Sequence, residues 1–560
     1  MAVAALVECQ GAVVGGHVGR KLAPDPRLVP EAMEHQQGDP VLTPLEELQV
    51  EVVRASDTMG GGLHAAYPNA PSPSFRSGAP NCRGGGALRA SLGGVRDISD
   101  VLAALERRSD ESVDELVELS RIPGVSAAGF DAAELERSAL AVAALLSRAG
   151  LQNVEVLRIP GAHPYVVGDW LGAGPDAPTA LVYAHHDVQP PGRLEHWETP
   201  AFEPCIRPDG RLYGRGVVDD KAGIVLHTAA IRAWLEAREG LPLNLKFLVE
   251  GEEEIGSGHL ADFLRGYRER LQSDVLVLSD TANLATGLPS LTTSLRGIVS
   301  LDVTVRALDH PIHSGMWGGP VPDAAAALTR ICARLVDDRG AIAVAGLSDD
   351  VPPLTQAERS GLEALPFDAE AFRSDAGMGG GAEFSGEAEY SVYERLWYRP
   401  ALALTALEAM PLAGAANQLV SQARARVSVR TAPGQDPQRV AALLADTLKR
   451  DAPVGVRVST RLHAAVPGWK TVAEGPAFEA ARRALAAGYG CEPVTIGCGA
   501  TIPFVGPFVE VLGGVPALLL GLEDPPCNAH GENESLDLSD FQRASRASAH
   551  LWQELAEFPP

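Results

Sequence analysis

The sequence predicts an α/β fold interrupted by an inserted α+β domain. Short apolar runs rich in Val, Ile and Leu alternate with segments of helical period, which is typical of a buried sheet covered by helices. Between Arg296 and about His463 the pattern changes, because period-two alternation dominates there. The length of 560 residues, 21% of them charged, allows several ordinary globular domains.

The first 95 or so residues show no sustained helical or strand period. They contain Gly60–Gly62, a Pro/Ser stretch over 68–80 and Gly84–Gly86. We interpret residues 1–95 as largely disordered or as a non-native extension. The pattern resumes near Ile98, and residues 97–121 predict one helix that ends before Ile122-Pro123.

The elements of the two domains follow from their periods. The main domain has expected strands at 180–183, 243–249, 275–278 and 517–520, with a helix at 223–238. The insert has expected strands at 300–307, 423–431 and 456–462, with helices at 322–336 and 436–449. The Gly-rich run 377–381 is expected to be a loop, since no Lys-Ser/Thr follows it as in a phosphate-binding loop.

Composition excludes several classes of partner. The formal net charge of −25 argues against nucleic-acid binding, which needs clustered Lys and Arg, and favours a solvated acidic surface. No run approaches the roughly 18 apolar residues of a membrane helix, and the N-terminus lacks the basic region of a signal peptide. Seven scattered cysteines without a CxxC pair fit reduced thiols. We therefore expect a cytoplasmic protein without a membrane or nucleic-acid partner.

Acidic residues and histidines follow most of the expected strands. In open α/β sheets, ligands bind outside the carboxyl ends of the strands. Another acidic pair directly precedes the helix at 223–238. The residues at these positions are His185, Asp187, Asp219, Asp220, the run Glu250 to Glu254, Asp280 and His530.

Each of these segments alone has an ordinary interpretation. The HxD sequence is typical of a polar turn, an acidic cluster of a solvated helix start, and Asp-Asp of a helix N-cap. Several acids meeting at one sheet edge repel one another, however, unless cations lie between them. Imidazole and carboxylate without thiolate suit zinc, manganese or cobalt in a catalytic site. Two such ions need a bridging carboxylate, and one further carboxylate must move a proton, duties that Glu253 and Glu254 can divide.

Five motifs carry a family resemblance that extends from about residue 98 to the C-terminus. They are YAHHDVQP (183–190), LYGRGVVDDK (212–221), EGEEEIGS (250–257), HSGMWGG (313–319) and Ala529-His530. In combination they resemble the co-catalytic zinc peptidases, a family that includes carnosine dipeptidases, bacterial dipeptidases, aminoacylases, acetylornithine deacetylase and succinyl-diaminopimelate desuccinylase. The first two motifs and the insert of roughly 170 residues are most similar to the dipeptidase branch.

The resemblance implies a fold and a metal site. The expected fold is a zinc-peptidase catalytic domain (98–295 and 464–560) with a mixed sheet flanked by helices, interrupted by a lid and dimerisation domain (296–463). Two divalent ions are implied, most readily zinc, with manganese or cobalt as alternatives. Asp219 would bridge them, after which the family has a cis peptide. The other ligands would be His185 and Asp280 at one ion, and Glu254 and His530 at the other.

The resemblance also implies catalytic and substrate-binding roles. Asp187 would orient His185, and Glu253 would act as general base and then acid. In a homodimer, His313 would reach the partner's active site and stabilise the oxyanion. Arg430 would hold the substrate carboxylate, and Asn417 and Thr501 lie near substrate-binding positions of the family. His186, His196 and His310 match no family ligand and are interpreted as local structure.

The implied activity is hydrolysis of a dipeptide amide bond beside a free carboxylate by metal-activated water. An N-acyl-amino-acid deacylase with the same machinery and a metal-binding scaffold without activity are the alternatives. A register shift by one residue, which would make Glu252 the base and Glu253 the ligand, also stays open. The chain departs from the dipeptidase pattern Arg-Glu-Gly-Gly-Ser-Ile-Pro, since it reads Gly497-Cys498-Gly499-Ala500-Thr501-Ile502-Pro503.

Overall fold

The computed structural model describes residues 97–379, 381–450 and 452–557. The interpretation of residues 1–95 lies outside this range. No helix among the described residues is long and apolar enough to cross a membrane.

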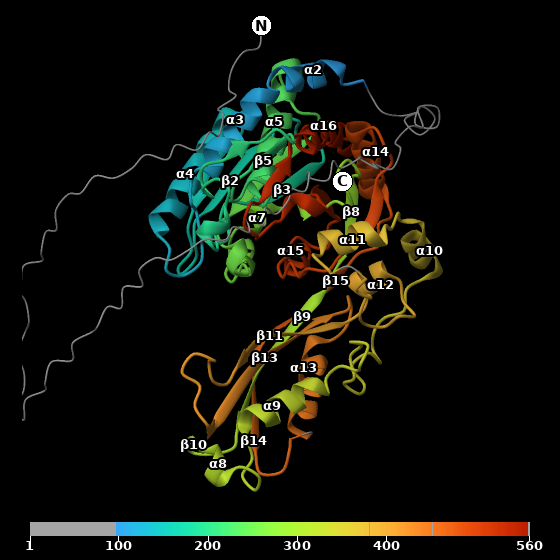
Figure 1. Ribbon diagram of the computed structural model, residues 1–560. Coiled ribbons are helices and arrows are strands. Elements are labelled where there is room, and N and C mark those ends of the chain that lie inside the picture. The colour runs from blue at the N-terminus through green and yellow to red at the C-terminus, as the bar shows by residue number, and fades with distance from the viewer. Residues whose placement is uncertain (1–96, 380, 451, 558–560) are drawn as a thin grey trace, which may run out of the picture. The chain divides into compact units, whose positions relative to one another are not determined.

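A nine-stranded mixed sheet forms the main part of the described chain (Figure 1). Its order is β1-β2-β6-β3-β7-β17-β8-β15, with β16 also paired to β8. The pairs β3–β6, β3–β7, β7–β17 and β8–β16 are parallel, and the others are antiparallel. The strands are β1 Gln152–Leu157, β2 Tyr165–Trp170, β3 Thr179–His185, β6 Asn244–Glu250, β7 Val275–Ala282, β8 Ser290–Leu295, β15 Trp469–Lys470, β16 Val494–Cys498 and β17 Ala517–Glu523.

Helices cover both faces of this sheet. Successive side chains of β3 point to opposite faces, and each set packs against a different group of helices. Val182 and Ala184 pack into a core with α2 Ser99–Arg107, α3 Ser109–Ser120, α4 Ala132–Arg148, α5 Lys221–Arg238, α14 Pro476–Tyr489 and α16 Leu538–Leu555. Leu181 and Tyr183 pack on the opposite face with α6 Leu260–Gly266, α7 Arg268–Leu271 and α15 Val505–Val511.

The predicted α/β class is confirmed. The single helix expected over 97–121 is wrong, because the chain breaks at Arg108 (φ −106°, ψ 11°) into α2 and α3.

A second, four-stranded antiparallel sheet follows β8 directly. Its order is β11-β13-β9-β14, with β9 Gly297–Arg306, β11 Ala401–Glu408, β13 Gln422–Thr431 and β14 Arg457–Val466. Val299, Leu301, Val303 and Val305 of β9 pack against α9 Ala324–Ala333 and α13 Pro437–Arg450, which cover one face. β11 was not expected from the sequence. It lies at an edge of this sheet, and nearly all of its side chains are exposed.

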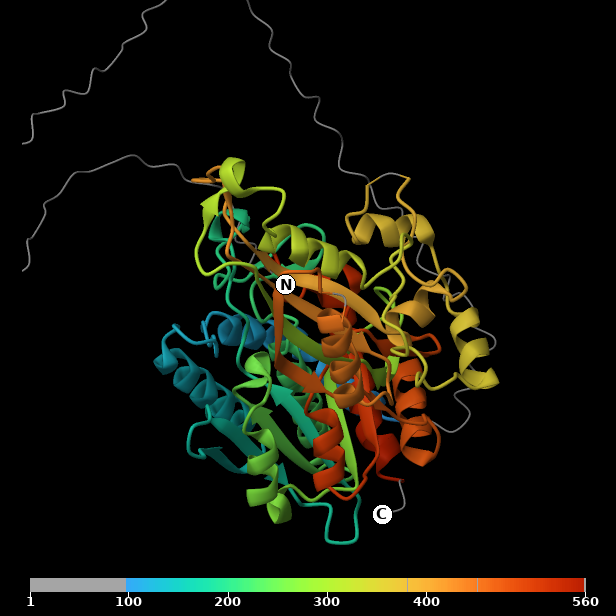
Figure 2. The ribbon, with the colours of Figure 1, turned by 90° about the horizontal axis from the view of Figure 1, so that it is seen from below.

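Three short helices precede β11 and lie to one side of the four-stranded sheet, in yellow in Figures 1 and 2. They are α10 Gln356–Ala364, α11 Ala369–Asp375 and α12 Val392–Trp397. Trp397 of α12 packs with Ile496 of β16 and stacks on Tyr393 at a ring-centroid distance of 4.7 Å. This segment therefore contacts the main sheet beside Gly497 and Cys498.

The remaining elements are small. β10 Ile312–His313 pairs with β12 Gln418–Leu419, and α8 Ser314–Trp317 follows β10. A three-stranded sheet contains β18 Ser535–Asp537, β5 Arg211–Tyr213 and β4 Cys205–Ile206. Three 3₁₀ turns, η1 Leu194–His196, η2 Glu253–Ile255 and η3 Pro525–Cys527, complete the described chain.

Candidate active site

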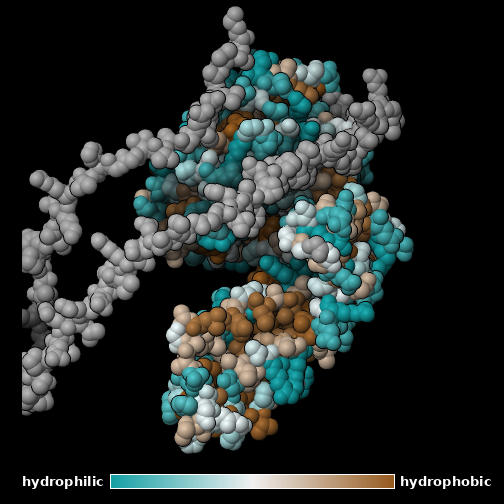
Figure 3. Space-filling view, viewed as in Figure 1, coloured by the Kyte–Doolittle hydropathy of each residue, from teal (hydrophilic) through white to brown (hydrophobic). Residues whose placement is uncertain are grey.

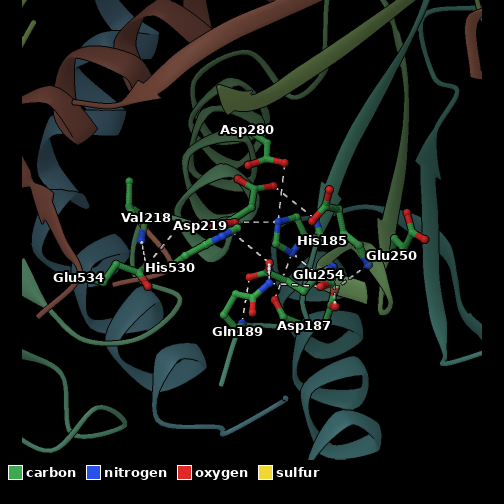
Figure 4. Close-up of polar contacts among 12 residues, drawn as sticks. His185, Asp187, Gln189, Val218, Asp219, Glu250, Glu254, Asp280, His530 and Glu534 are labelled. Carbon is green, nitrogen blue, oxygen red and sulfur yellow. Dashed lines mark hydrogen bonds and ion pairs between the residues drawn. The ribbon is translucent and has the colours of Figure 1, made fainter. Parts of the chain in front are cut away.

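Five side chains from separate elements meet at the carboxyl edge of the main sheet (Figure 4). His185 ends β3, Asp219 precedes α5, Glu254 lies in η2 after β6, Asp280 lies in β7, and His530 follows η3. They form two groups, His185–Asp219–Asp280 and Asp219–Glu254–His530, and within each group the possible ligand atoms lie within 4.8 Å of one another. The two groups share Asp219.

Asp219 lies between the two histidines. Its Oδ1 is 3.0 Å from His185 Nε2, and its Oδ2 is 2.9 Å from His530 Nε2. Glu254 Oε2 lies 3.2 Å from His530 Nε2, and Asp280 Oδ2 lies 3.7 Å from His185 Nε2. The Asp219–Asp220 peptide is cis, as the resemblance implied.

The electrostatics of this cluster fit divalent cations. His185 Nδ1 lies 3.1 Å from the Asp187 carbonyl oxygen, so Nδ1 donates and the lone pair of Nε2 faces carboxylates. With its proton on Nδ1, this buried Nε2 cannot donate to the Asp219 carboxylate 3.0 Å away, so two acceptors face each other. Asp219 and Glu254 raise the pKa of His530 to about 11, which shows how strongly the cluster favours positive charge. Imidazole and carboxylate donors suit zinc-type ions, which would occupy the space between these groups.

Asp187 links the end of β3 to η2. Its carboxylate accepts hydrogen bonds from the backbone N–H groups of Glu253 (3.2 Å) and Glu254 (3.1 Å), and its Oδ1 lies 3.5 Å from His185 Nδ1. Although burial opposes it, the neighbouring His185 lowers the pKa of Asp187. Asp187 therefore fixes both the imidazole and the two glutamates that follow β6.

Glu253 is the carboxylate beside the cluster that is free to exchange a proton. No hydrogen bond to its carboxylate is present among the described residues, unlike Glu254, which accepts from Gln189 N (2.9 Å) and Gln189 Nε2 (2.7 Å). Burial, reinforced by Asp219 and Glu254, raises the pKa of Glu253 to about 8. A carboxylate with a raised pKa beside a cation site is suited to general-base chemistry.

Glu252 points away from the cluster. Its Oε1 accepts hydrogen bonds from the Tyr165 hydroxyl (3.3 Å) and the His259 backbone N–H (2.7 Å). A register in which Glu252 acts as the base therefore requires breaking these bonds, so the geometry favours Glu253.

Arg430 and Thr501 meet, whereas Asn417 lies elsewhere. Arg430 Nη1 donates to Thr501 Oγ1 over 2.6 Å. The Asn417 carbonyl accepts from Ser314 N (2.9 Å), next to His313. The described contacts therefore bring Arg430 and Thr501 together and place Asn417 beside His313.

His313 is exposed and lies at the end of the four-stranded sheet that is far from the ligand cluster. β9 begins two residues after β8 ends, and β10 follows its other end, so the length of β9, about 30 Å, separates His313 from Leu295. His313 Nδ1 accepts from Gly315 N over 3.0 Å. The neutral ring therefore carries its proton on Nε2, the donor that an oxyanion needs.

Sequence reasoning missed several residues that support the cluster. Gln189 holds Glu254, and Arg215 pairs with Glu534 at 2.6 Å while donating to the carbonyls of His530 (3.1 Å) and Gly531 (3.0 Å). Gln189 and Arg215 lie inside motifs identified from the sequence, but no pattern indicated which side chain each contacts. Gly251 also lies in one of these motifs, and only glycine fits there, because a Cβ would lie 2.6 Å from the Pro164 carbonyl oxygen.

Comparison with known proteins agrees with this arrangement. Residues 181–554 match the family described as peptidase family M20/M25/M40. The chain is 33% identical to the cysteinylglycine-S-conjugate dipeptidase of Corynebacterium striatum over 378 residues, which are 67% of this chain and 81% of that protein. Its fold is similar to human carnosine dipeptidase 1 (TM-score 0.72, 27% identity, 83% and 100% of the two chains) and to the dipeptidase Dug1p of Saccharomyces cerevisiae (TM-score 0.72, 25%, 82% and 99%).

Proposed function

The chain belongs to peptidase family M20/M25/M40, and we propose that it is a metal-dependent dipeptidase that cleaves an amide bond beside a free carboxylate. The observation that carries this proposal is Asp219, which lies between two histidines near a carboxylate, Glu253, that accepts no hydrogen bond among the described residues. The names of the relatives support the substrate class, because they include a cysteinylglycine-S-conjugate dipeptidase and a carnosine dipeptidase.

Two divalent ions, most readily zinc, would be held by the two groups that share Asp219. His185 and Asp280 would complete one site, and Glu254 and His530 the other. Manganese or cobalt suits the same donors. When bound, such ions polarise a carbonyl and make water a stronger acid near neutral pH.

The protein's own groups would carry the proton transfers. Glu253 takes a proton from the attacking water and delivers it to the leaving amine. Asp187 keeps Glu253 in place through its backbone N–H and keeps the His185 ring oriented.

Arg430 would bind the carboxylate of the substrate. Its guanidinium is anchored by Thr501 at 2.6 Å and is half-buried, so a carboxylate bound there is partly shielded from water. Thr501 would contribute through the same hydroxyl.

We place this activity in a homodimer. β11 is an edge strand with no partner on its outer side among the described residues, and Figure 3 shows apolar residues gathered over this part of the four-stranded sheet. Leu407 is 55% exposed and Leu412 97%. Pairing of this edge with a second copy would cover such residues. In that dimer His313, with Asn417 beside it, would reach the partner's site and donate Nε2–H to the oxyanion.

We also propose a role for each of the two domains. Residues 98–295 and 464–560 would form the catalytic domain, and 296–463 the lid and dimerisation domain. We also propose a cytoplasmic location, which the cysteines support, because the five described ones are all outside disulfides.

A substrate panel tests the proposal. Dipeptides and N-acetyl amino acids would be assayed with Zn²⁺ or Mn²⁺. Cleavage of dipeptides in preference to N-acetyl amino acids is expected. The opposite preference would identify an N-acyl-amino-acid deacylase, and no turnover of any amide would indicate a metal-binding scaffold without activity.

A further inference from the structure

Two arginines hold the same loop of the candidate substrate pocket. Arg296 Nε donates to the Gly499 carbonyl over 3.0 Å, and Arg430 Nη1 donates to Thr501 Oγ1 over 2.6 Å. The strand register brings the two arginines close. Arg430 of β13 lies opposite Ile298 of β9, and Arg296 precedes Ile298 by two residues. Both guanidinium groups therefore lie beside the segment Gly497 to Thr501, where this chain departs from the dipeptidase pattern.

Neither guanidinium has a carboxylate partner among the described residues. The other acceptors of Arg296 are backbone carbonyls of Arg395 and Arg399, each at 3.5 Å, and Arg430 bonds only the Thr501 hydroxyl. Arg296 is 9% exposed. Burial, together with the nearby charge of Arg430, lowers the pKa of Arg296 to about 10, so both groups stay cationic at neutral pH. Two neighbouring cations removed from water are costly unless an anion joins them.

The residues that could have supplied this anion do not. Cys498 lies close enough to interact with both arginines, and burial raises the pKa of its thiol, so it is uncharged near neutral pH. In the dipeptidase pattern this position is glutamate. Position 497, which is arginine in that pattern, has no room for a side chain of either charge, since a Cβ there would lie 2.6 Å from Trp397 Cβ and 2.6 Å from Ser294 Oγ.

We propose that Arg296 and Arg430 form a two-guanidinium subsite for a dianionic C-terminal residue, so that the preferred substrates are dipeptides ending in aspartate or glutamate. This inference rests on the proposed function, in which Arg430 binds the α-carboxylate. Arg296 then binds the side-chain carboxylate through Nη2, which makes no hydrogen bond within the described part of the chain. Charge-assisted hydrogen bonds of this kind are the strong ones in proteins.

The wild-type enzyme tests the inference with matched substrates. Ala-Glu and Ala-Gln have nearly the same shape but differ by one charge, and Glu-Ala and Gln-Ala place the same difference at the other residue. We expect kcat/KM to be at least about tenfold higher for Ala-Glu than for Ala-Gln, with a smaller difference for the second pair. Equal values for Ala-Glu and Ala-Gln would overturn the subsite while leaving the dipeptidase in place. No cleavage of any dipeptide would instead contradict the proposed function.

A variant pair locates the effect at these arginines. Cys498→Glu places a carboxylate beside both guanidinium groups, and Cys498→Gln is the uncharged control of the same size. The ratio of kcat/KM for Ala-Glu over Ala-Gln is expected to fall about tenfold in Cys498→Glu and to stay near the wild-type value in Cys498→Gln. Thermal melting and metal content confirm that both variants fold. Identical ratios in two folded variants would overturn the inference, and if Cys498→Glu does not fold, the wild-type comparison still decides.

Discussion

Arg215 Nη1 lies 2.6 Å from Glu534 Oε2, and both side chains are almost completely buried. Arg215 also donates to the carbonyl of His530, and Glu534 accepts from Val218 N at 3.1 Å. The pair therefore ties the segment that carries His530 to the segment that leads into Asp219.

Arg215→Met should destabilise the protein by about 3–5 kcal/mol, because it leaves the buried Glu534 carboxylate without a countercharge. Chemical denaturation measures the free energy of unfolding, and metal analysis should show weaker binding at the His530 site. The control is Arg215→Met with Glu534→Leu, which removes both charges and should recover much of the stability. A double variant as unstable as the single one would contradict this explanation.

Much of the fold was predictable because the apolar runs at β3, β6, β7 and β17 are rich in Val, Ile and Leu and alternate with helices of clear period. The meeting of these five side chains was predictable too, since each follows an expected strand or precedes an expected helix, and all but Asp280 lie within one of the five motifs. β11 was not, because an edge strand of Ala and Leu with most side chains exposed lacks the contrast between a buried and a solvated face. The break between α2 and α3 was missed because the apolar spacing continues through Arg108.

The contacts that hold the site residues in place were harder to predict. Contacts such as Gln189 with Glu254, or Arg296 with Gly499, join residues far apart in sequence, and no local pattern specifies them. The same holds for Asn417, whose backbone carbonyl accepts a hydrogen bond from Ser314 N beside His313.

His313→Ala should lower kcat by roughly 10²–10³ and leave the metal content unchanged, as expected for loss of one oxyanion donor. Steady-state kinetics beside metal analysis checks this. Mixing the variant with Glu253→Ala should restore part of the activity, because one site of each mixed dimer then contains both groups. Verified mixed dimers without recovered activity would argue against a histidine acting on the partner's site.

His227 should make the protein less stable in acid. Its ring lies between Ser279 Oγ and Ser548 Oγ, 2.9 Å from each, and burial lowers its pKa from 6.5 to about 3. The unfolded chain therefore binds the extra proton between pH 6.5 and 3. The contribution of neutral His227 to the free energy of unfolding is complete above pH 6.5. Below pH 6.5 this contribution falls by about 1.4 kcal/mol per pH unit. Unfolding free energies of wild type and His227→Gln over this range should show a shallower slope for the variant, and equal slopes would contradict the assignment.

Removal of metal should lower the melting temperature. Asp219, Asp280 and Glu254 repel one another without cations, and any ion that binds the folded state stabilises it, by about 2.7 kcal/mol at one hundred times its Kd. Differential scanning calorimetry with Zn²⁺ and with a chelator measures the shift. Asp219→Asn should lose most of it, so an equal shift in that variant would place the stabilising metal elsewhere.

The central claim is that the adjacent glutamates of η2 have different roles, Glu253 in proton transfer and Glu254 in metal binding. Glu253 has no hydrogen bond to its carboxylate among the described residues, Glu254 lies 3.2 Å from His530 Nε2, and Glu252 is held by Tyr165 and His259.

The most direct measurement is the metal stoichiometry of Glu252→Gln, Glu253→Gln and Glu254→Gln beside their single-turnover rates. The expected result is two ions bound in Glu253→Gln with a rate lower by about 10²–10⁴, and weaker metal binding in Glu254→Gln with some recovery in excess metal. Glu252→Gln should keep both its ions and most of its rate. Loss of an ion from Glu253→Gln, with both retained in Glu254→Gln, would contradict the assignment.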